Sequence, residues 1–278
     1  MKKILVPTDF SKNAENAFDY AIELSQNESV TIVLIHCFYV MYTSPEFPME
    51  LMVEQSNSIK INSDEQLKEL SKKVLKYPSL KCEYLSIEGF IVDSIKDIIK
   101  KKKIDLVVMG TKGASGISEV LIGSNTAKII TKLDCPVIAV PEKAIYHGIK
   151  KVAYATNYLS SDITTLKKLV EFTKKFKSKV EIIHIADEEC NKECEKEYMT
   201  KFSQKVEKKI TYKAISYELI FGDKIEEKLA QYMKKETIDM LAISTKHKNL
   251  FERIFTKGIT KKLAYHTSIP LIVFHYKK

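Results

Sequence analysis

A glycine-spaced segment in the first half of the chain has the residue types that phosphate binding needs. Gly110 and Gly113 are separated by two residues, and Gly123 follows after nine more, directly before Ser124 and a helical pattern. Glycine lets the main chain approach a phosphate without a Cβ in the way. A helix that opens with serine presents free N–H groups and positive dipole charge to an anion. The spacing therefore predicts a polyphosphate cradle.

Other candidate residues follow the apolar runs of the same half. Residues 7–9 (Pro-Thr-Asp) follow the first run, Cys37 follows His36 at the end of the second, and Met109 directly precedes the glycine segment. Parallel sheets bind ligands beyond the carboxyl ends of their strands. Asp9 is open to two interpretations, a ligand contact or a cap for the helix that follows. His36 is interpreted as a packing residue.

An internal repeat organises the elements that must position these residues. Residues 3–9 match residues 151–157 at an offset of 148, and residues 135–140 match residues 269–274 at an offset of 134. The second copy is therefore about 14 residues shorter. We place the deletion after Cys37, where residues 39–55 contain two prolines and are predicted to form an irregular loop.

Apolar runs rich in β-branched residues alternate with segments of helical period in both copies. We predict an α/β fold with two tandem, doubly wound, five-stranded parallel-sheet domains of Rossmann-like topology. The domains are placed at residues 1–143 and 149–278, with a linker at 144–148. Strands are predicted near residues 2–7, 30–36, 81–87, 104–109, 136–140, 150–155, 179–185, 212–220, 238–243 and 270–275. Helices of the first copy are predicted from Ser11 and over residues 58–77, 90–103 and 124–133.

Composition narrows the class of protein. The chain has 278 residues, of which 45% are hydrophobic and 29% charged, and no apolar run approaches the roughly 18 residues of a membrane helix. No signal-peptide core follows the first residues. Five cysteines, an odd number, argue against an extracellular disulfide framework. We therefore expect a cytoplasmic protein without a membrane partner.

The net charge of +9 lies in the second copy. Residues 1–143 carry 18 lysines and 19 acidic residues, so residues 144–278 carry the remaining 27 basic and 17 acidic ones. Arg253 is the only arginine, whereas nucleic-acid sites usually combine arginine with stacking aromatics. A solvated lysine face is therefore favoured over a nucleic-acid partner.

These motifs resemble the universal stress protein family in its nucleotide-binding form, and the whole chain resembles a tandem member. The resemblance rests on residues 6–11 (Val-Pro-Thr-Asp-Phe-Ser) and on the Gly110-x2-Gly113-x9-Gly123-Ser124 pattern, which precedes Cys-Pro-Val-Ile-Ala-Val. It implies that the first domain binds ATP, alone or with Mg²⁺. The binding residues that it implies are Pro7, Thr8 and Asp9 for the nucleoside, Cys37, Met109 and Gly110 around the adenine, and Gly113, Gly123, Ser124 and Asn125 for the phosphates.

The second copy departs from this pattern. The replacements, first copy to second, are Asp9 to Asn157, Gly110 to Ser244, Gly113 to His247, Gly123 to Lys257 and Ser124 to Gly258. Side chains at former glycines would crowd the path of the phosphates. We predict that the second domain keeps the fold and binds no nucleotide, so that one chain binds one ATP.

The chain lacks a Walker-type motif and evident paired carboxylates for two metals. ATP is therefore expected to act as a regulatory ligand. Two alternatives stay open: a slow ATPase or autophosphorylating protein that uses Ser124 or Thr126, with Asp9 helping to place Mg²⁺, and a nucleotide-free interaction module. The resemblance also implies that the two domains pair through their last strands as an intramolecular pseudo-dimer, with further homo-oligomers open.

Cys190 and Cys194, with His184 upstream, resemble half of a metal site. No second pair completes four ligands. We therefore interpret residues 188–195 as the start of an amphipathic helix with both cysteines on one face, used in core or interface packing. His184 stands at a strand end equivalent to that of His36, and packing is favoured there too.

Overall fold

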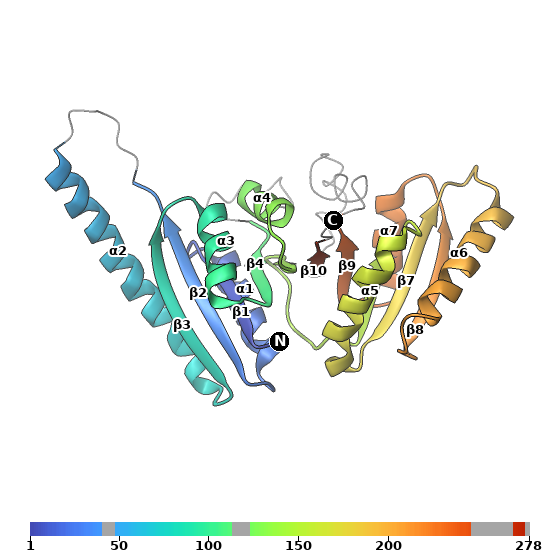
Figure 1. Cartoon of the computed structure of the whole chain (residues 1–278), viewed down its shortest axis with the longest axis horizontal. Coiled ribbons are helices and arrows are strands. Elements are labelled where there is room, and N and C mark those ends of the chain that lie inside the picture. Colours follow the sequence, from blue (N-terminus) through green and yellow to red (C-terminus); the bar gives the residue numbers. More distant parts are fainter. Residues whose placement is uncertain (41–47, 113–122, 246–268, 276–278) are drawn as a thin grey trace. The chain divides into compact units, whose positions relative to one another are not determined.

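Apolar runs of the first repeat form five parallel strands in the order β3-β2-β1-β4-β5 (Figure 1). The computed structural model describes residues 1–40, 48–112, 123–245 and 269–275, which divide into two units at the boundary between Glu142 and Lys143. The strands of the first unit are β1 (Lys3–Pro7), β2 (Val30–Phe38), β3 (Leu80–Glu88), β4 (Leu106–Gly110) and β5 (Val137–Val140).

Helices cover both faces of this sheet. Right-handed crossovers place α1 and α2 on one face, because the chain there moves from β1 towards β3, and α3 and α4 on the other, because it moves back towards β5. Figure 1 shows α3 and α4 together in front of the sheet, and they contact each other. The helices are α1 (Lys12–Ser25), α2 (Met49–Ser71), the 3-10 helix η1 (Lys72–Lys76), α3 (Ile91–Lys102) and α4 (Ser124–Lys132).

The core of the first unit is centred on β1. Leu5 pairs with Val33 of β2 on one side and with Val107 of β4 on the other, and all three side chains are fully buried. A strand buried on both faces needs a continuous apolar run, which is the pattern that the sequence shows.

The second unit repeats this architecture with the strand order β8-β7-β6-β9-β10. Its elements are β6 (Lys151–Ala155), α5 (Ser160–Thr173), the 3-10 helix η2 (Lys174–Phe176), β7 (Lys179–Ala186), α6 (Lys192–Glu207), β8 (Ile215–Phe221), α7 (Ile225–Lys235), β9 (Met240–Ser244) and β10 (Leu271–Phe274). The predicted α/β fold with parallel five-stranded sheets is confirmed. In the first unit α4 connects β4 to β5, and the corresponding residues of the second unit, 246–268, lie outside the described residues. No helix in the described ranges is long and apolar enough to cross a membrane.

The prediction of an irregular loop over residues 39–55 is partly wrong, because α2 begins at Met49. Pro48 is the N-cap residue, with φ −60° and ψ 131°. Proline is well suited to a helix start, since its missing N–H would have no partner there. The helix has 23 residues, against 16 in the equivalent α6. Part of the length difference between the two copies therefore lies in this helix.

An aspartate closes the amino edge of each sheet in the same way. The Oδ2 atom of Asp105 accepts hydrogen bonds from the amides of residues 2 and 3 at 2.6 and 3.0 Å. The Oδ2 atom of Asp239 accepts from the amides of residues 150 and 151 at 2.7 and 2.8 Å. The repeat seen in the sequence is thus reproduced at the level of single atoms.

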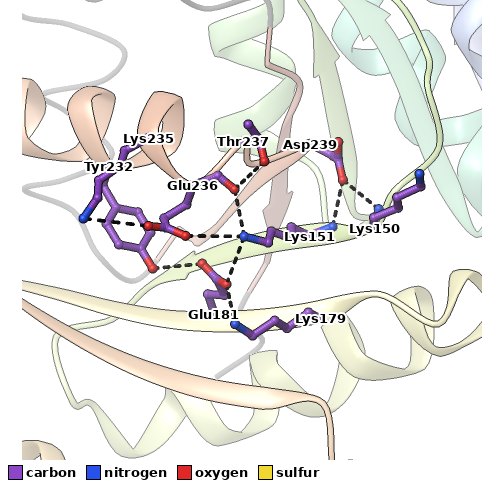
Figure 2. A network of polar contacts seen from close by, with 9 residues as sticks. All are labelled: Lys150, Lys151, Lys179, Glu181, Tyr232, Lys235, Glu236, Thr237 and Asp239. Atoms are coloured by element: carbon purple, nitrogen blue, oxygen red, sulfur yellow. Dashed lines mark hydrogen bonds and ion pairs between the residues drawn. The ribbon is translucent and has the colours of Figure 1, made fainter.

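A polar network occupies the amino ends of β6 and β7 (Figure 2). The Glu181 carboxylate, 3% exposed, accepts hydrogen bonds from Lys179 Nζ and Tyr232 Oη, both at 2.8 Å, and lies 3.8 Å from Lys151 Nζ. Burial raises the pKa of Glu181. The hydrogen bonds from Lys179 and Tyr232 and the lysine charges together lower the pKa by more than burial raises it, so the pKa lies below its ordinary value. The network lies away from the carboxyl ends of the strands and stabilises the unit rather than forming a ligand site there.

Candidate functional site

The turn between β1 and α1 is fixed by a series of hydrogen bonds. Thr8 N donates to the carbonyl of Ile35 in β2 at 2.8 Å, and the Thr8 hydroxyl accepts from Phe10 N at 3.0 Å. The Asp9 carboxylate accepts from the amide and the hydroxyl of Ser11 at 3.1 and 2.6 Å. Asp9 is therefore an exposed carboxylate held in place at the carboxyl end of β1.

Ser11 caps α1, as the sequence predicts, and Asp9 supports this cap. The Ser11 hydroxyl donates to Asp9 and accepts from Ala14 N at 3.2 Å. Asp9 therefore does not cap the helix itself. It orients Ser11, whose hydroxyl accepts the hydrogen bond from the helix amide.

His36 positions the same turn from β2. Its Nδ1 atom lies 2.8 Å from the carbonyl oxygen of Thr8, and because a carbonyl can only accept, Nδ1 carries the proton. The Phe10 ring lies 4.5 Å from the imidazole, and Phe10 has a φ of 61°, a strained left-handed conformation for a non-glycine residue. The imidazole therefore holds a turn that the backbone alone would disfavour.

Gly110 is a glycine because Asn13 of α1 leaves no room for a side chain. A Cβ at this position would lie 2.5 Å from Asn13 Oδ1 and 2.9 Å from its Cγ. Asn13 is buried, with Oδ1 accepting from Lys112 N at 2.7 Å and Nδ2 donating to the carbonyl of Val140 at 3.2 Å. Packing against Asn13 alone thus requires glycine at this position, and the nucleotide contact of Gly110 stays a prediction. Asn13 is a residue that sequence reasoning missed.

The N-terminus of α4 is attached to the end of β4. Gly123 N donates to the carbonyl of Thr111 at 2.6 Å, and the Thr126 hydroxyl donates to the carbonyl of Gly110 at 2.9 Å. Gly123 is the N-cap residue and has no capping side chain, and Ser124 is the first residue of α4. Glycine is accepted at an N-cap and needs no partner.

Ser124 and Asn125 are both exposed in the first turn of α4. The first N–H groups of a helix lack intrahelical partners and carry the positive end of the dipole, so this turn has the chemistry of an anion site. Thr126, the other residue considered for phosphoryl transfer, is buried and its hydroxyl is donated to Gly110. Ser124 is therefore the more accessible hydroxyl of the two.

Cys37 lies half-buried near the end of β2, where it pairs with Ile87 of β3. Burial raises the pKa of its thiol to about 11, and a hydrogen bond with Ser94 lowers it in part. The thiol is therefore neutral near pH 7 and presents a small, weakly polar surface.

The fold brings most of the predicted site residues to one edge of the first sheet. Strands β2, β1 and β4 are neighbours, so their carboxyl ends lie side by side. The candidates at these ends and on the first turn of α4 are Pro7, Thr8, Asp9, Cys37, Met109, Gly110, Gly123, Ser124 and Asn125. Gly113 lies outside the described residues.

The described residues also form an open cleft between α1 and α2, with room of about 560 Å³. Phe10 and Glu15 line it from one side, and Glu65 and Glu69 from the other. Lys68 also lines the cleft, and Glu15 and Glu69 form ion pairs with Lys73 and Lys72, so the cleft has no surplus of positive charge to hold a triphosphate. The anion chemistry therefore stays with α4.

Comparison with known proteins agrees with this arrangement of the strands. A family model described as "Universal stress protein family" matches residues 1–141. The chain belongs to the universal stress protein family. A universal stress protein of Methanocaldococcus jannaschii is 33% identical over 145 residues, which span 50% of this chain and 81% of that protein.

Two further relatives span both units. A universal stress protein of Synechocystis is 24% identical over 99% of this chain and 100% of its own length. The crystal structure of a universal stress protein from Archaeoglobus fulgidus covers 98% of both chains with a TM-score of 0.68 and 16% identity, which shows a shared fold. The family therefore includes chains with the same two-unit organisation.

The second unit reproduces the β1–α1 turn of the family fold almost bond for bond. Thr156 N donates to Ile183 O at 2.9 Å, its hydroxyl accepts from Tyr158 N at 3.0 Å, and its carbonyl lies 2.7 Å from His184 Nδ1. Tyr158 has a φ of 60° and lies 4.2 Å from the imidazole of His184. The turn geometry is thus common to both units and does not by itself distinguish a ligand site.

The surroundings of that second turn are more acidic than those of the first. The Asp162 carboxylate, fully buried, accepts from the Thr156 hydroxyl at 2.6 Å and from Tyr154 Oη at 3.1 Å, where the first unit has Ala14 at the equivalent of Asp162. Glu195 Oε2 lies 3.5 Å from His184 Nε2. These carboxylates make the second edge unfavourable for an anion.

Cys190 and Cys194 do not share a helix face, contrary to the prediction. Asn191 caps α6, so Cys190 precedes the helix, and Cys194 is exposed rather than packed in a core. Within the part of the chain that the structure describes, no three His, Cys, Asp or Glu side chains are placed to hold a metal ion.

Proposed function

We propose that the first unit binds one adenine nucleotide, ATP, as a regulatory ligand at the carboxyl ends of β2, β1 and β4. Thr8 and Asp9 contact the nucleoside, Cys37 and Met109 border the base, and the first turn of α4 holds the phosphates. The observation that carries the proposal is the attachment of this turn to β4 by Thr126 and Gly123, which presents exposed helix N–H groups beside the β1–α1 turn.

The hydrogen bonds described above support this site because they preorganise it. The Asp9 carboxylate is oriented by Ser11, the Thr8 backbone by His36, and the start of α4 by Thr126. A preorganised site loses little conformational entropy when the ligand binds. Cys37 contributes a neutral thiol, which suits contact with an uncharged base.

The second unit is proposed to bind no nucleotide. Asn157 replaces the aspartate, Ser244 is fully buried at the end of β9, and Asp162 and Glu195 add negative charge beneath and beside the turn. A triphosphate would meet these carboxylates at short range in a partly buried site, where charges are weakly screened. His247 and Lys257, the other replacements, lie outside the described residues.

Titration calorimetry with ATP tests this proposal. We expect a stoichiometry near one per chain, and Asp9→Ala is expected to weaken binding about tenfold to hundredfold, the effect of losing a hydrogen bond to a charged group. Asn157→Ala is the matched control at the same turn of the second unit and is expected to leave the affinity unchanged. Two sites per chain, or no binding, would overturn the assignment.

A slow phosphoryl transfer to Ser124 is the second candidate function, favoured by the exposure of this residue on the first turn of α4. Incubation with γ-labelled ATP separates the two candidates. Label retained by the unaltered chain and lost in Ser124→Ala favours autophosphorylation, with Thr126→Ser as a control that keeps the buried hydroxyl. Absence of label together with measurable ATP binding favours a regulatory ligand.

Two other expectations stay predictions. One is the pairing of the two domains through their last strands as a pseudo-dimer. The other is the cytoplasmic location of the protein. Sedimentation of the purified chain with and without ATP measures its oligomeric state, and cell fractionation measures its location.

A further inference from the structure

Four residues at the ends of β2 and α3 form a continuous surface beside the proposed nucleotide site. Cys37 and Tyr39 alternate with the buried Phe38, so they lie on the same side of the strand. Phe90 and Ser94 are four residues apart across the first turn of α3, where Ser94 N donates to Phe90 O at 3.0 Å. Two contacts join the end of β2 to the start of α3: the Cys37 thiol is hydrogen bonded with Ser94, and the Tyr39 ring stacks on the Phe90 ring.

The outer of these two contacts is a ring pair open to solvent. The Tyr39 and Phe90 centroids are 4.8 Å apart with an interplanar angle of 21°, yet the residues are 56% and 65% exposed. Gly89 directs Phe90 to this place, since its φ of 148° suits glycine and its amide donates to Phe38 O at 2.8 Å. Two stacked rings fixed by a turn form a flat, preorganised apolar surface.

We propose that the Tyr39–Phe90 ring pair is a stacking platform for the base of the nucleotide bound in the first unit. The proposal rests on the proposed function and extends it along β2. Residues two apart on a strand are separated by about 6.6 Å. A purine that contacts Cys37 therefore reaches the level of Tyr39. Every nucleobase has a π face, so an aromatic platform adds affinity for the base and none for the phosphates.

The second unit lacks this platform. The strand position equivalent to Tyr39 is Asp187, and the N-cap of α7, equivalent to Phe90, is Lys224. Lys228 takes the place of Ser94 and lies against Gly222, as Ser94 lies against Gly89. The fold thus presents a charged surface where the first unit presents rings, in agreement with a base-binding role confined to the first unit.

The test compares ATP with inorganic tripolyphosphate, which has no base. Tyr39→Ala and Phe90→Ala are each expected to weaken ATP binding about tenfold while the affinity for tripolyphosphate stays unchanged. The control is Tyr84→Ala, which removes an exposed aromatic ring from β3 away from the platform. Circular dichroism of the variants confirms that they are folded.

The absence of tryptophan from the chain provides a second readout. Phe90→Trp introduces a single indole at the platform, and its fluorescence is expected to be quenched by ATP and not by tripolyphosphate. Unchanged ATP affinity in both alanine variants, or an indole that does not respond while ATP binds, overturns the platform alone. If the unaltered chain binds no ATP, the proposed function and the platform both fall.

Discussion

Asn13 occupies the space into which a side chain on Gly110 would project. The distance from Asn13 Oδ1 to a Cβ built on Gly110 is 2.5 Å, far inside van der Waals contact. The second copy has Ser161 and Ser244 at the two equivalent positions. A smaller residue on the helix thus accompanies a larger one on the strand, which indicates that the pair, rather than the glycine alone, is the unit to test.

Gly110→Ser is expected to lower the free energy of unfolding by about 1–3 kcal/mol through overpacking against Asn13. Asn13→Ser alone also destabilises, because Lys112 N and Val140 O lose their partner. The double variant recreates the pair of the second copy and is expected to be more stable than the sum of the single effects, by at least about 0.5 kcal/mol. Urea unfolding measures this coupling, and strictly additive effects would show that the two sites are independent.

Cys37 is expected to react slowly with iodoacetamide at pH 8. Its pKa of about 11, raised mainly by burial, reduces the thiolate fraction about a hundredfold relative to a thiol with the ordinary pKa of 9.0. The rate should rise with pH until about 11. Peptide mass spectrometry measures the modification, with free cysteine as the reference. Ser94→Ala, which removes the bond that lowers this pKa, should slow the reaction further, and a rate equal to the reference would contradict the burial of the thiol.

Glu181→Gln is expected to lower the free energy of unfolding of the second unit by about 1–3 kcal/mol at pH 7, because an amide cannot satisfy both Lys179 and Tyr232 as the carboxylate does. The pKa of Glu181 is lower in the folded chain than its ordinary value of 4.5. Its contribution is therefore present above about pH 4.5 and is lost as the pH falls through the folded-state pKa.

Acid titration of unfolding measures this contribution. Glu181→Gln should make the acid side of the stability profile less steep. The control is Glu197→Gln on α6, whose partner Lys201 is 60% exposed, and no measurable change is expected there. An unchanged acid profile in Glu181→Gln would show that this carboxylate is not the group that titrates.

Asp105→Ala and Asp239→Ala are expected to destabilise their respective units by a similar amount, about 1–2 kcal/mol. Each removes one oxygen that accepts two amide hydrogen bonds at the amino edge of a sheet. The asparagine variants keep an accepting oxygen and should cost less. Thermal unfolding of the four variants measures this. A large loss in only one of the two alanine variants would contradict the equivalence of the repeats.

The inner strands of both sheets could be predicted because burial on two faces leaves a strong signal. Leu5 and Val107 lie in continuous apolar runs for that reason. The start of α2 could not be predicted in the same way, since Pro48 is compatible with a loop and with a helix start, and α2 buries only Ser63 and Leu67. A helix with so little buried surface has almost no periodic pattern.

The strand-end and glycine residues of the candidate site were predictable from their spacing, but the residues that hold them were not. Asn13 contacts Lys112 across 99 positions, and Thr126 contacts the carbonyl of Gly110 across 16. Neither contact follows a local period. Glu181 was missed for a related reason, because two of its three partners, Lys151 in β6 and Tyr232 in α7, come from other elements.

The hydrogen bond between Gly123 N and Thr111 O brings together the two ends of the segment that spans residues 113–122. Insertions or deletions within such a closed segment leave its anchor points fixed, and doubling its length costs only about 0.6 kcal/mol of closure entropy. Evolution can therefore edit this stretch without moving β4 or α4.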